Sequence, residues 1–358
     1  MEVKVVIGAN YGDESKGLVS GCLAREAIEN QNKKVLTVLY NGTSQRAHTY
    51  QNKIYRLEGT GAAHGADTFY HRAFVVDPII LWLTKTTPII DPRCRVIFPC
   101  DVLYGQTREK QVKHGSCGCG LFAAVKRAEA MQEPYIVGDF FLPENHAFYQ
   151  KIQCTDRWYD YEPNEIHNLP NFLRAVKWVK ENCRFLRFED IVEQYDTIIF
   201  EGGQGLLLDQ TNTGDFPHLT PSSTGGYFIH DDIEQLGVRA DLFYVSRSYM
   251  TRHGNGPMDK EVKKEWISPD IVDLTNQPNE WQGILRYGLL DVDKLNARII
   301  RDAAQYNCNK TINMVYTHLN YTDNKLASVH GKINIIKPDF VTTMWGSDKK
   351  DFMGKIDV

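Results

Sequence analysis

The stretch VKVVIGANYGDESKG, residues 3–17, decides the fold. It begins with a β-branched run, continues through a glycine-rich turn, and leads into a helical pattern in which Val19, Cys22 and Ala27 share one face. A strand, a tight turn and a helix start in this order form an anion site, because free backbone N–H groups and the helix dipole point at the same place. Lys16 adds a positive charge, so the stretch predicts a phosphate-binding loop.

This loop differs from the common phosphate loop, whose pattern is GxxxxGK[ST]. Asp13, Glu14 and Ser15 interrupt that pattern. A carboxylate in a phosphate loop repels the ligand unless it binds Mg²⁺ or acts as a base, so Asp13 is a candidate for chemistry. The alternative, from these residues alone, is a polar turn in which Asp13 caps the following helix.

Short β-branched runs alternate with amphipathic helical stretches along the rest of the chain. The alternation predicts an α/β fold with a large, mostly parallel sheet and helices on both faces. No repeat or linker divides the chain, so we expect a single domain over residues 1–358 with loop excursions such as residues 158–162. The expected strands cover residues 3–7, 34–40, 95–99, 196–201, 241–249 and 312–319.

Composition excludes several classes of protein. The 358 residues include 41 basic and 45 acidic side chains, so the chain lacks the positive charge of a duplex nucleic-acid binder. We find neither a signal-peptide pattern nor an apolar run of membrane-spanning length. The eight cysteines form no paired CxxC sets, which argues against a disulfide scaffold or a zinc site. We therefore expect a cytoplasmic protein that binds neither nucleic acid nor membrane.

Several segments resemble motifs of one enzyme family and occur in that family's order. GDESKG (12–17) resembles the GDEGKG loop of adenylosuccinate synthetases, and QRAHT (45–49) is similar to their NAGHT segment. FEGGQG (200–205) with Leu208 and Asp209 resembles FEGAQGxxLD, and YMTRHGNGP (249–257) resembles YxTRxGxGP. Between them, Pro217, Thr220, Ser222 and Ser223 resemble the family's YPxVTSS. The resemblance runs from residue 3 to about residue 320 and implies a P-loop-NTPase-like adenylosuccinate synthetase fold.

The resemblance implies a ligase that joins L-aspartate to C6 of a purine nucleoside monophosphate. A nucleoside triphosphate phosphorylates the 6-oxo oxygen, and the amine of aspartate then displaces the phosphate. Asp13 would be the base at purine N1, and His48, as an imidazolium, would donate to the phosphoryl group and O6. Mg²⁺ would be held by Asp13 and the backbone carbonyl of Ala47. From the residues alone, a structural role for His48 stays open.

The resemblance also assigns binding residues and an assembly. It implies a homodimer in which a basic residue, Lys126 or Arg127, crosses into the partner site. GSCGCG (115–120) stands where the family has GTTGxG, and the alternative there is a glycine-rich loop with ordinary buried thiols. The triphosphate would contact Gly12, Glu14, Ser15, Lys16, Gly17, Thr49, Asn320 and Gly346. The purine monophosphate would contact Asp13, Gln45, Ser116, Gln204 and Thr220, and L-aspartate would contact Arg252 and Arg286.

Four departures from the family pattern cluster around the ligands. Ser15 replaces a glycine, Gln45 replaces an asparagine, and Arg286 is the one guanidinium in the segment that loosely matches TTGRxRR. Thr-His-Leu-Asn at 317–320 replaces TKLD, whose Asp reads guanine. A carboxylate matches the two N–H donors of guanine, whereas the Asn320 amide matches the donor and acceptor of adenine. The sequence therefore favours ATP or dATP as phosphoryl donor.

With these departures and its modest length, the chain most resembles the bacteriophage branch, the 2-aminoadenylosuccinate synthetases. That resemblance implies dGMP, L-aspartate and ATP or dATP as substrates, in the host cytoplasm if the protein is encoded by a phage. One alternative is an ordinary adenylosuccinate synthetase that uses IMP and GTP. Another, of a different class, is a nucleotide-binding switch protein without ligase activity.

Overall fold

The structure is a computed structural model that describes residues 1–131, 135–143, 168–273, 276, 281–322, 340–344 and 352–356. At Asn320 and in the last two ranges the description covers the backbone alone. The predicted residues 158–162 and Gly346 lie outside the described residues.

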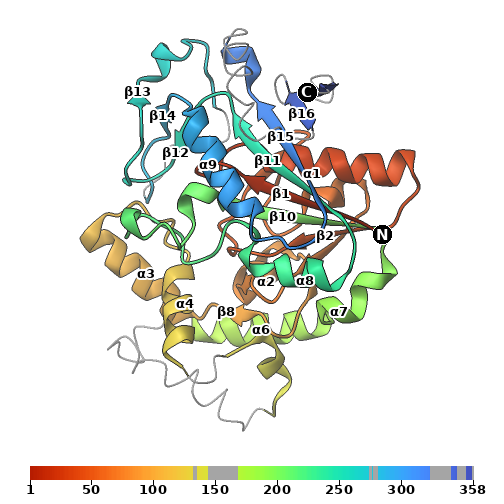
Figure 1. The fold of residues 1–358 in the computed structure, drawn as a ribbon. Coiled ribbons are helices and arrows are strands. Elements are labelled where there is room, and N and C mark those ends of the chain that lie inside the picture. Colours follow the sequence, from red (N-terminus) through yellow and green to blue (C-terminus); the bar gives the residue numbers. More distant parts are fainter. Residues whose placement is uncertain are drawn as a thin grey trace.

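A ten-stranded sheet forms the centre of the described structure, in the order β17-β16-β15-β11-β1-β10-β2-β5-β7-β9 (Figure 1). Neighbouring strands are parallel throughout, except for the antiparallel pair β16 and β17. The predicted mostly parallel sheet is thus confirmed. The strands are β1 (Glu2–Gly8), β2 (Val35–Leu39), β5 (Asp67–Tyr70), β7 (Ile89–Ile90), β9 (Arg184–Phe185), β10 (Thr197–Gly205), β11 (Ala240–Arg247), β15 (Lys310–Thr317), β16 (Phe340–Met344) and β17 (Phe352–Ile356).

Helices cover both faces of the sheet. The central strand β1 carries apolar side chains on both of its sides, and these pack in two different cores. Val5 and Ile7 belong to a core with α7 (Phe188–Ile191), α8 (His230–Gln235) and α9 (Val292–Ala303). Val6, one residue out of phase, packs in the core under α1 (Lys16–Arg25). Toward β7, a third core includes residues of α2 (Pro78–Thr84) and α6 (Leu169–Asn182).

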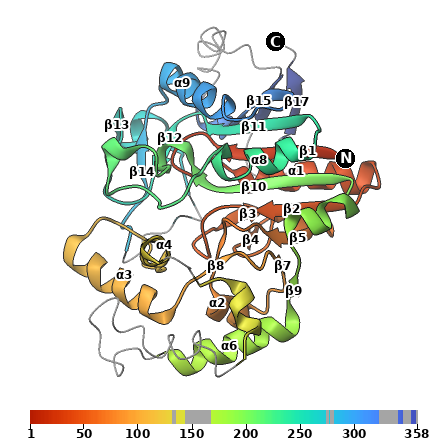
Figure 2. The ribbon, with the colours of Figure 1, turned by 60° about the horizontal axis from the view of Figure 1, so that its bottom comes forward.

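Smaller elements gather on the side of the molecule toward which β1 runs from the N-terminus (Figures 1 and 2). They include α3 (Pro99–Val112), α4 (Leu121–Ala130) and a small sheet of β12 (Met250–Arg252), β14 (Arg286–Gly288) and β13 (Glu261–Val262). Two further pairs are β3 (His48–Tyr50) with β4 (Lys53–Tyr55), and β6 (Val75–Val76) with β8 (Arg95–Val96). The short helical turns are η1 (Glu26–Asn30), η2 (Thr60–His64), η3 (Val137–Phe141), η6 (Val192–Gln194), η7 (Leu206–Leu208), η8 (Thr213–Asp215), η9 (Gly226–Phe228), η10 (Lys264–Trp266) and η11 (Leu319–Tyr321).

The observed strands match the predicted ranges to within two residues at each end, except in two cases. The run 95–99 forms only the two residues of β8, outside the main sheet, because Pro99 opens α3. The run 196–201 continues as β10 to Gly205, where Gly205 pairs with Gly8 after a register shift. Gln204 therefore lies inside the end of a strand instead of after it.

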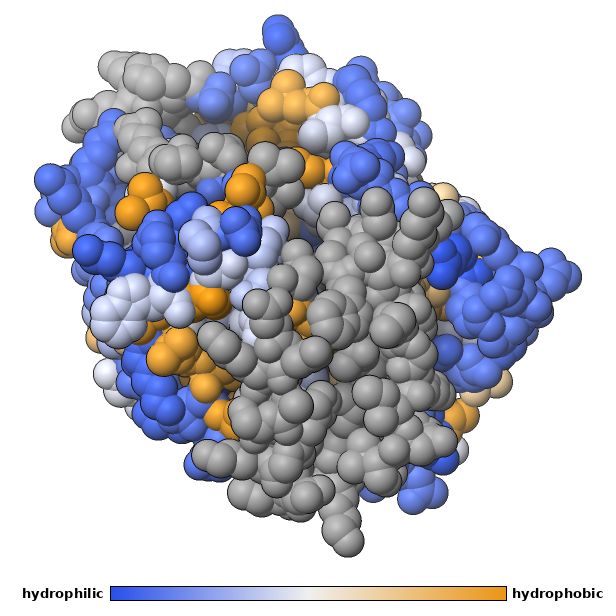
Figure 3. Space-filling model, turned by 90° about the horizontal axis from the view of Figure 1, so that it is seen from above, coloured by the Kyte–Doolittle hydropathy of each residue, from blue (hydrophilic) through white to orange (hydrophobic). Residues whose placement is uncertain are grey.

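None of the helices in the described part of the chain combines the length and apolar character needed to cross a membrane. On the face shown in Figure 3, hydrophilic residues predominate in the described surface and hydrophobic residues form scattered patches.

Candidate active site

A cavity of ≈ 410 Å³ lies where the carboxyl ends of β1, β10 and β11 meet the loops that follow them. Open parallel sheets collect their ligands at this edge. Residues from the phosphate loop, the end of β10, β12 and the α3–α4 loop all line the cavity. Nine of the predicted site residues are brought together there: Gly12, Asp13, Gln45, Ala47, His48, Ser116, Gln204, Thr220 and Arg252.

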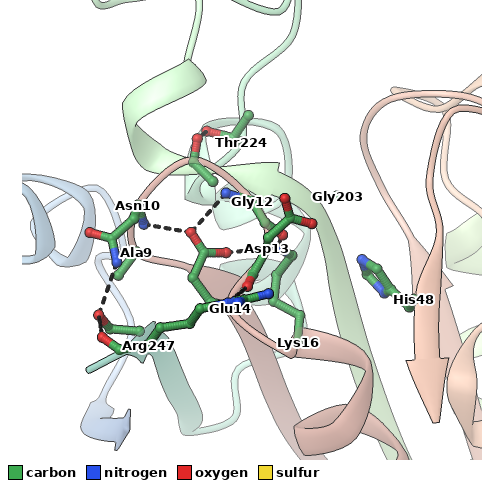
Figure 4. A network of polar contacts seen from close by, with 12 residues as sticks. Ala9, Asn10, Gly12, Asp13, Glu14, Lys16, His48, Gly203, Thr224 and Arg247 are labelled. Atoms are coloured by element: carbon green, nitrogen blue, oxygen red, sulfur yellow. Dashed lines mark hydrogen bonds and ion pairs between the residues drawn. The ribbon is translucent and has the colours of Figure 1, made fainter. Parts of the chain in front are cut away.

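The phosphate loop is shaped by Glu14, whose carboxylate turns back into the loop (Figure 4). Its Oε1 accepts from the backbone N–H of Asn10 at 3.0 Å and of Gly12 at 2.7 Å. Lys16 donates to Glu14 Oε2 at 3.1 Å and to the Gly12 carbonyl at 2.5 Å. Both side chains are almost fully buried, so in this structure they fix the turn on which Asp13 is presented.

Ser15 and Gly17 show why this loop favours glycine. Ser15 has φ 71° and ψ 34°, in the left-handed region, and occupies the N-cap of α1 without a side-chain capping bond. A Cβ on Gly17 would lie 2.6 Å from the Cβ of His48, so Gly17 lets the His48 strand pack on α1. The alternative in which Asp13 caps this helix is wrong, because Ser15 occupies the cap.

We expect Ser15→Gly to stabilise the protein by about 0.5–1 kcal/mol. The left-handed conformation destabilises the folded state by roughly 1–2 kcal/mol for an L-residue, and glycine removes this cost. Glycine also has more conformational freedom in the unfolded chain, which reduces the gain in stability by about 0.5–1 kcal/mol. Urea denaturation measures the change, and Ser15→Ala, which keeps Cβ, should show no gain. A Ser15→Gly variant less stable than wild type would contradict this account.

Asp13 pairs with a residue that the motifs do not specify. His253 Nε2 lies 3.2 Å from Asp13 Oδ2, and the same ring nitrogen contacts Asn276 Oδ1 at 3.1 Å. Burial alone would raise the pKa of Asp13, but the His253 hydrogen bond and the charges of His253, Arg247 and Lys16 bring it below its usual value. Burial lowers the pKa of His253, and Asp13 more than offsets this. Asp13 is thus ionised at neutral pH, as a base must be.

His48 belongs to a buried network with Arg46 and Glu201. Its Nδ1 lies 2.6 Å from Glu201 Oε1, to which Arg46 Nη2 also donates at 3.0 Å. Thr60 donates its N–H and hydroxyl to the other Glu201 oxygen, at 3.0 and 2.9 Å. Burial and the Arg46 charge lower the pKa of His48 to about 4, against the opposing pull of Glu201.

This pKa changes the expected state of His48. In the free protein at neutral pH the ring is neutral, not an imidazolium. Because the Glu201 carboxylate only accepts, Nδ1 carries the proton and Nε2 holds a lone pair. A negatively charged ligand beside His48 would raise its pKa and favour the second proton.

The end of β10 offers polar atoms that lack protein partners. Gln204 has φ 60°, a left-handed conformation that is strained for any residue except glycine. Gln204 Oε1 and Thr220 Oγ1 are buried and have no hydrogen-bond partner among the described residues. Buried polar atoms without partners are rare in folded proteins and indicate a ligand at this position. Asp209 holds the Thr220 loop by accepting from Ser223 Oγ at 3.0 Å and Thr224 N–H at 2.7 Å.

The structure does not present Arg286 as a free carboxylate clamp. Arg286 lies outside the cavity lining, and its guanidinium donates to Glu261 and to the carbonyls of Gly254 and Gly256. Arg252 does line the cavity, but it also donates to backbone carbonyls, those of Pro257 and His218. In this conformation both arginines brace the loop of residues 254–257, and their roles toward L-aspartate stay predictions.

The remaining predicted residues lie around the cavity. Glu14, Ser15, Lys16 and Gly17 form the loop beneath it, and Thr49 is half-buried beside His48. The Asn320 backbone follows β15, where Thr317 Oγ1 donates to the Glu14 carbonyl at 3.1 Å. The segment that would read the base therefore packs against the phosphate loop.

Lys126 and Arg127, the two candidates for a residue that crosses a dimer interface, differ in burial and in their partners. Arg127 is buried and donates to both carboxylate oxygens of Asp101, at 2.9 and 2.8 Å, so it is unsuited to that role. Lys126 is exposed and forms an ion pair with Glu129 at 2.7 Å.

Comparison with known proteins agrees with this geometry. The family model of adenylosuccinate synthetase matches residues 5–292, which is most of the chain. The chain belongs to the adenylosuccinate synthetase family. It is 28% identical to the adenylosuccinate synthetase of Buchnera aphidicola over 293 residues, covering 72% of this chain and 65% of that one. With the enzyme of Halothermothrix orenii the identity is 24% over 319 residues, covering 81% and 72%.

The match thus spans just under two thirds of the length of the Buchnera relative. Among solved structures, the fully ligated adenylosuccinate synthetase of Plasmodium falciparum is similar, with a TM-score of 0.67, 16% identity, and coverage of 89% of this chain and 77% of that one. The succinoaminodeoxyadenylate synthetase of cyanophage S-2L, bound to dGMP and dATP as an energy donor, gives a TM-score of 0.66 and 14% identity. That match covers 98% of this chain and 95% of the cyanophage chain. These likenesses confirm the adenylosuccinate synthetase fold.

Sequence reasoning missed three residues that shape the site. Glu201 stands in the FEGGQG segment and Arg46 in QRAHT, so their places inside motifs were the available signal. His253 occupies a variable position of YxTRxGxGP, and its pairing with Asp13 joins residues 240 positions apart. Nothing local in the sequence indicates that contact.

Proposed function

We propose that the chain is a ligase that joins L-aspartate to C6 of a purine monophosphate, with dGMP as the purine substrate and ATP or dATP as phosphoryl donor. The products would be 2-amino-N6-succinyl-dAMP, ADP or dADP, and phosphate. The observation that carries the proposal is the single cavity in which the Asp13 carboxylate, the His48 imidazole and the unpartnered Gln204 and Thr220 oxygens meet. The family match supports the reaction class.

The residues divide the work of the two steps. Asp13, ionised beside His253, accepts the N1 proton of the purine, so that negative charge develops on O6 for attack on the triphosphate. His48 faces the transferred group from the opposite wall, and its second proton, gained as negative charge arrives, stabilises the phosphoryl oxygens and the leaving phosphate. Glu201 keeps the ring oriented through Nδ1.

The residues present fit a magnesium ion. Mg²⁺ in nucleotide sites is held by one or two protein oxygens and the substrate phosphates, so a full protein cage is unnecessary. Asp13 uses Oδ2 toward His253 and keeps its second carboxylate oxygen, and Ala47 is an exposed residue of the same cavity lining. Asp13 and the Ala47 carbonyl would hold the ion, which when bound neutralises charge on the phosphates.

The choice of phosphoryl donor is proposed from Asn320 and supported by the likeness to the cyanophage enzyme that binds dATP. We expect Asn320→Asp to shift the preference of kcat/KM from ATP toward GTP by roughly tenfold, because a buried polar group facing the wrong partner costs about 1–3 kcal/mol. The measurement compares ATP, dATP and GTP at saturating dGMP and L-aspartate. A wild-type protein that prefers GTP would overturn the adenine assignment.

A substrate matrix tests the proposed function directly. Phosphate release is measured for IMP, GMP and dGMP, each with ATP, dATP and GTP, with and without L-aspartate. The proposal predicts release that requires all three substrates and is fastest with dGMP and ATP or dATP. Fastest release with IMP and GTP would make the chain an ordinary adenylosuccinate synthetase. Triphosphate binding without aspartate-dependent release would favour the switch protein.

A further inference from the structure

The loop between α3 and α4 carries two thiols that the proposed reaction does not use. Cys117 and Cys119 both line the cavity, and both are partly exposed. Their sulfur atoms lie 3.2 Å apart, close enough to share a hydrogen bond. The alternative for this segment is a loop with ordinary buried thiols, whereas these two thiols are partly exposed and lie beside each other.

The glycine between them sets this distance. In an extended strand, residues two positions apart point to the same face with their Cα atoms about 6.6 Å apart. Gly118 has φ 65°, a left-handed turn that folds the chain and brings the two side chains together. A Cβ at Gly118 would lie 3.3 Å from Gln106 Cγ and 3.4 Å from the Trp281 ring, and Gln106 Nε2 donates to the Gly118 carbonyl. The turn at Gly118, between the two cysteines, is thus packed against Gln106 and Trp281.

The same loop is tied to the rest of the cavity. Gly115 N–H donates to Glu109 Oε1 of α3, at 2.5 Å. On the other side, Asn255 donates its N–H to the His114 carbonyl at 3.3 Å and its side-chain amide to the Lys113 carbonyl at 2.7 Å. Ser116, the proposed phosphate contact, directly precedes Cys117 and lines the cavity. A shift of the two sulfur atoms therefore moves the loop that carries this contact.

The two thiols differ in acidity. The hydrogen bond from Cys119 outweighs burial and lowers the pKa of Cys117 to about 7, whereas the same bond raises the pKa of Cys119. Cys117 is therefore the more acidic of the two thiols and the more readily ionised to a nucleophilic thiolate. This arrangement supplies one nucleophilic sulfur and one neighbouring sulfur within reach of it.

We propose that Cys117 and Cys119 form a redox-sensitive dithiol that closes to a disulfide and thereby weakens binding of the purine monophosphate. The oxidant is a low-molecular-weight disulfide. The Cys117 thiolate attacks one of its sulfur atoms and expels a first thiolate. Cys119, losing its proton, then attacks the Cys117 sulfur and expels a second. Two protein thiols are oxidised and one disulfide is reduced to two thiols. The identity of the ligand rests on the proposed function, but the closure itself does not.

Closure requires the sulfur atoms to move together from 3.2 Å to the bond length of about 2.05 Å. Rotation of the two side chains supplies part of this movement, and we expect the rest to displace the loop that carries Ser116. A displacement of about 1 Å in a positioning group can cost up to about 10²-fold in efficiency. We therefore expect oxidation to raise the dissociation constant for dGMP by about ten- to a hundredfold.

The experiment treats the full-length protein with oxidised glutathione, and then with dithiothreitol. Trypsin releases residues 114–126, a peptide that contains Cys117 and Cys119 and no other cysteine. Its mass shows whether the pair has lost two hydrogens, and calorimetry of dGMP binding is run on the same samples. We expect the disulfide, the loss of dGMP affinity, and recovery of both after reduction.

Two variants provide the controls. Cys117→Ser lacks the attacking thiolate, so it should form no disulfide in this peptide and show the same dGMP affinity before and after treatment, relative to its own reduced state. Cys308→Ser removes a partly exposed thiol elsewhere and should respond as wild type does. A peptide that keeps both thiols, or a disulfide that leaves dGMP binding unchanged, would overturn the proposal. Reduced protein that binds no purine monophosphate overturns the proposed function instead, while the peptide mass still decides whether the dithiol closes.

Discussion

Asp13→Asn should lower aspartate-dependent phosphate release by about 10²–10⁴-fold, the usual cost of losing a general base. The amide keeps the shape of the side chain but cannot accept the N1 proton. It also removes the charge that pairs with His253 at 3.2 Å and that would face Mg²⁺. The decrease should appear in kcat, measured with all substrates saturating and Mg²⁺ in excess.

The matched control is Asp270→Asn, which removes one carboxylate from an exposed position outside the cavity lining. It should keep the wild-type rate. We expect Asp13→Asn to fold, because the loop is held by Glu14 and not by the Asp13 side chain. Circular dichroism and the urea midpoint check that it does. A folded Asp13→Asn variant with near-normal turnover would remove Asp13 from the reaction.

His48→Ala should produce a loss of similar size, about 10²–10⁴-fold in kcat. The change removes the proposed donor to the phosphoryl group and leaves the buried Glu201 carboxylate without one of its partners. Glu201 keeps Arg46 and both Thr60 donors, so the fold should survive. His230→Ala, at the start of α8, is the control and should retain wild-type activity.

The pH dependence of stability gives His48 a second readout. Its pKa of about 4 lies below the unfolded value of 6.5, so the unfolded chain binds the extra proton first as the pH falls. Wild type should therefore lose stability from about pH 6.5 down to pH 4. His48→Ala should show a shallower decline over this range, measured by urea denaturation at several pH values. An unchanged slope would show that His48 is not buried as a neutral ring.

The sequence predicts the phosphate loop well, because strand, turn and helix signals are local. VKVVIG alternates between two apolar faces, so its central place in a sheet covered on both sides follows directly. The motif residues Gln204 and Thr220 also reach one cavity, since Gln204 stands at the carboxyl end of β10 and Thr220 lies in the chain that follows it.

The sequence does not predict which charged side chains form ion pairs or hydrogen bonds with one another. From the sequence, the Arg286 guanidinium is predicted to be available to bind a carboxylate. In the structure it donates to Glu261 and to two backbone carbonyls. Likewise, the sequence shows two cysteines separated by one residue, but it does not predict the distance between their sulfur atoms. That distance depends on the left-handed turn at Gly118 and on the packing of Trp281. Such contacts join distant segments and are decided by tertiary packing.

The transfer of the purine O6 atom into phosphate tests the central claim most directly. dGMP labelled with ¹⁸O at the 6-oxo position is incubated with L-aspartate, ATP and Mg²⁺, and the released phosphate is analysed by mass spectrometry. If Asp13 and His48 support phosphorylation of O6 and its displacement by the aspartate amine, each phosphate formed carries one ¹⁸O atom and the purine product carries none. Release of unlabelled phosphate, with the label retained on the purine, would contradict the account.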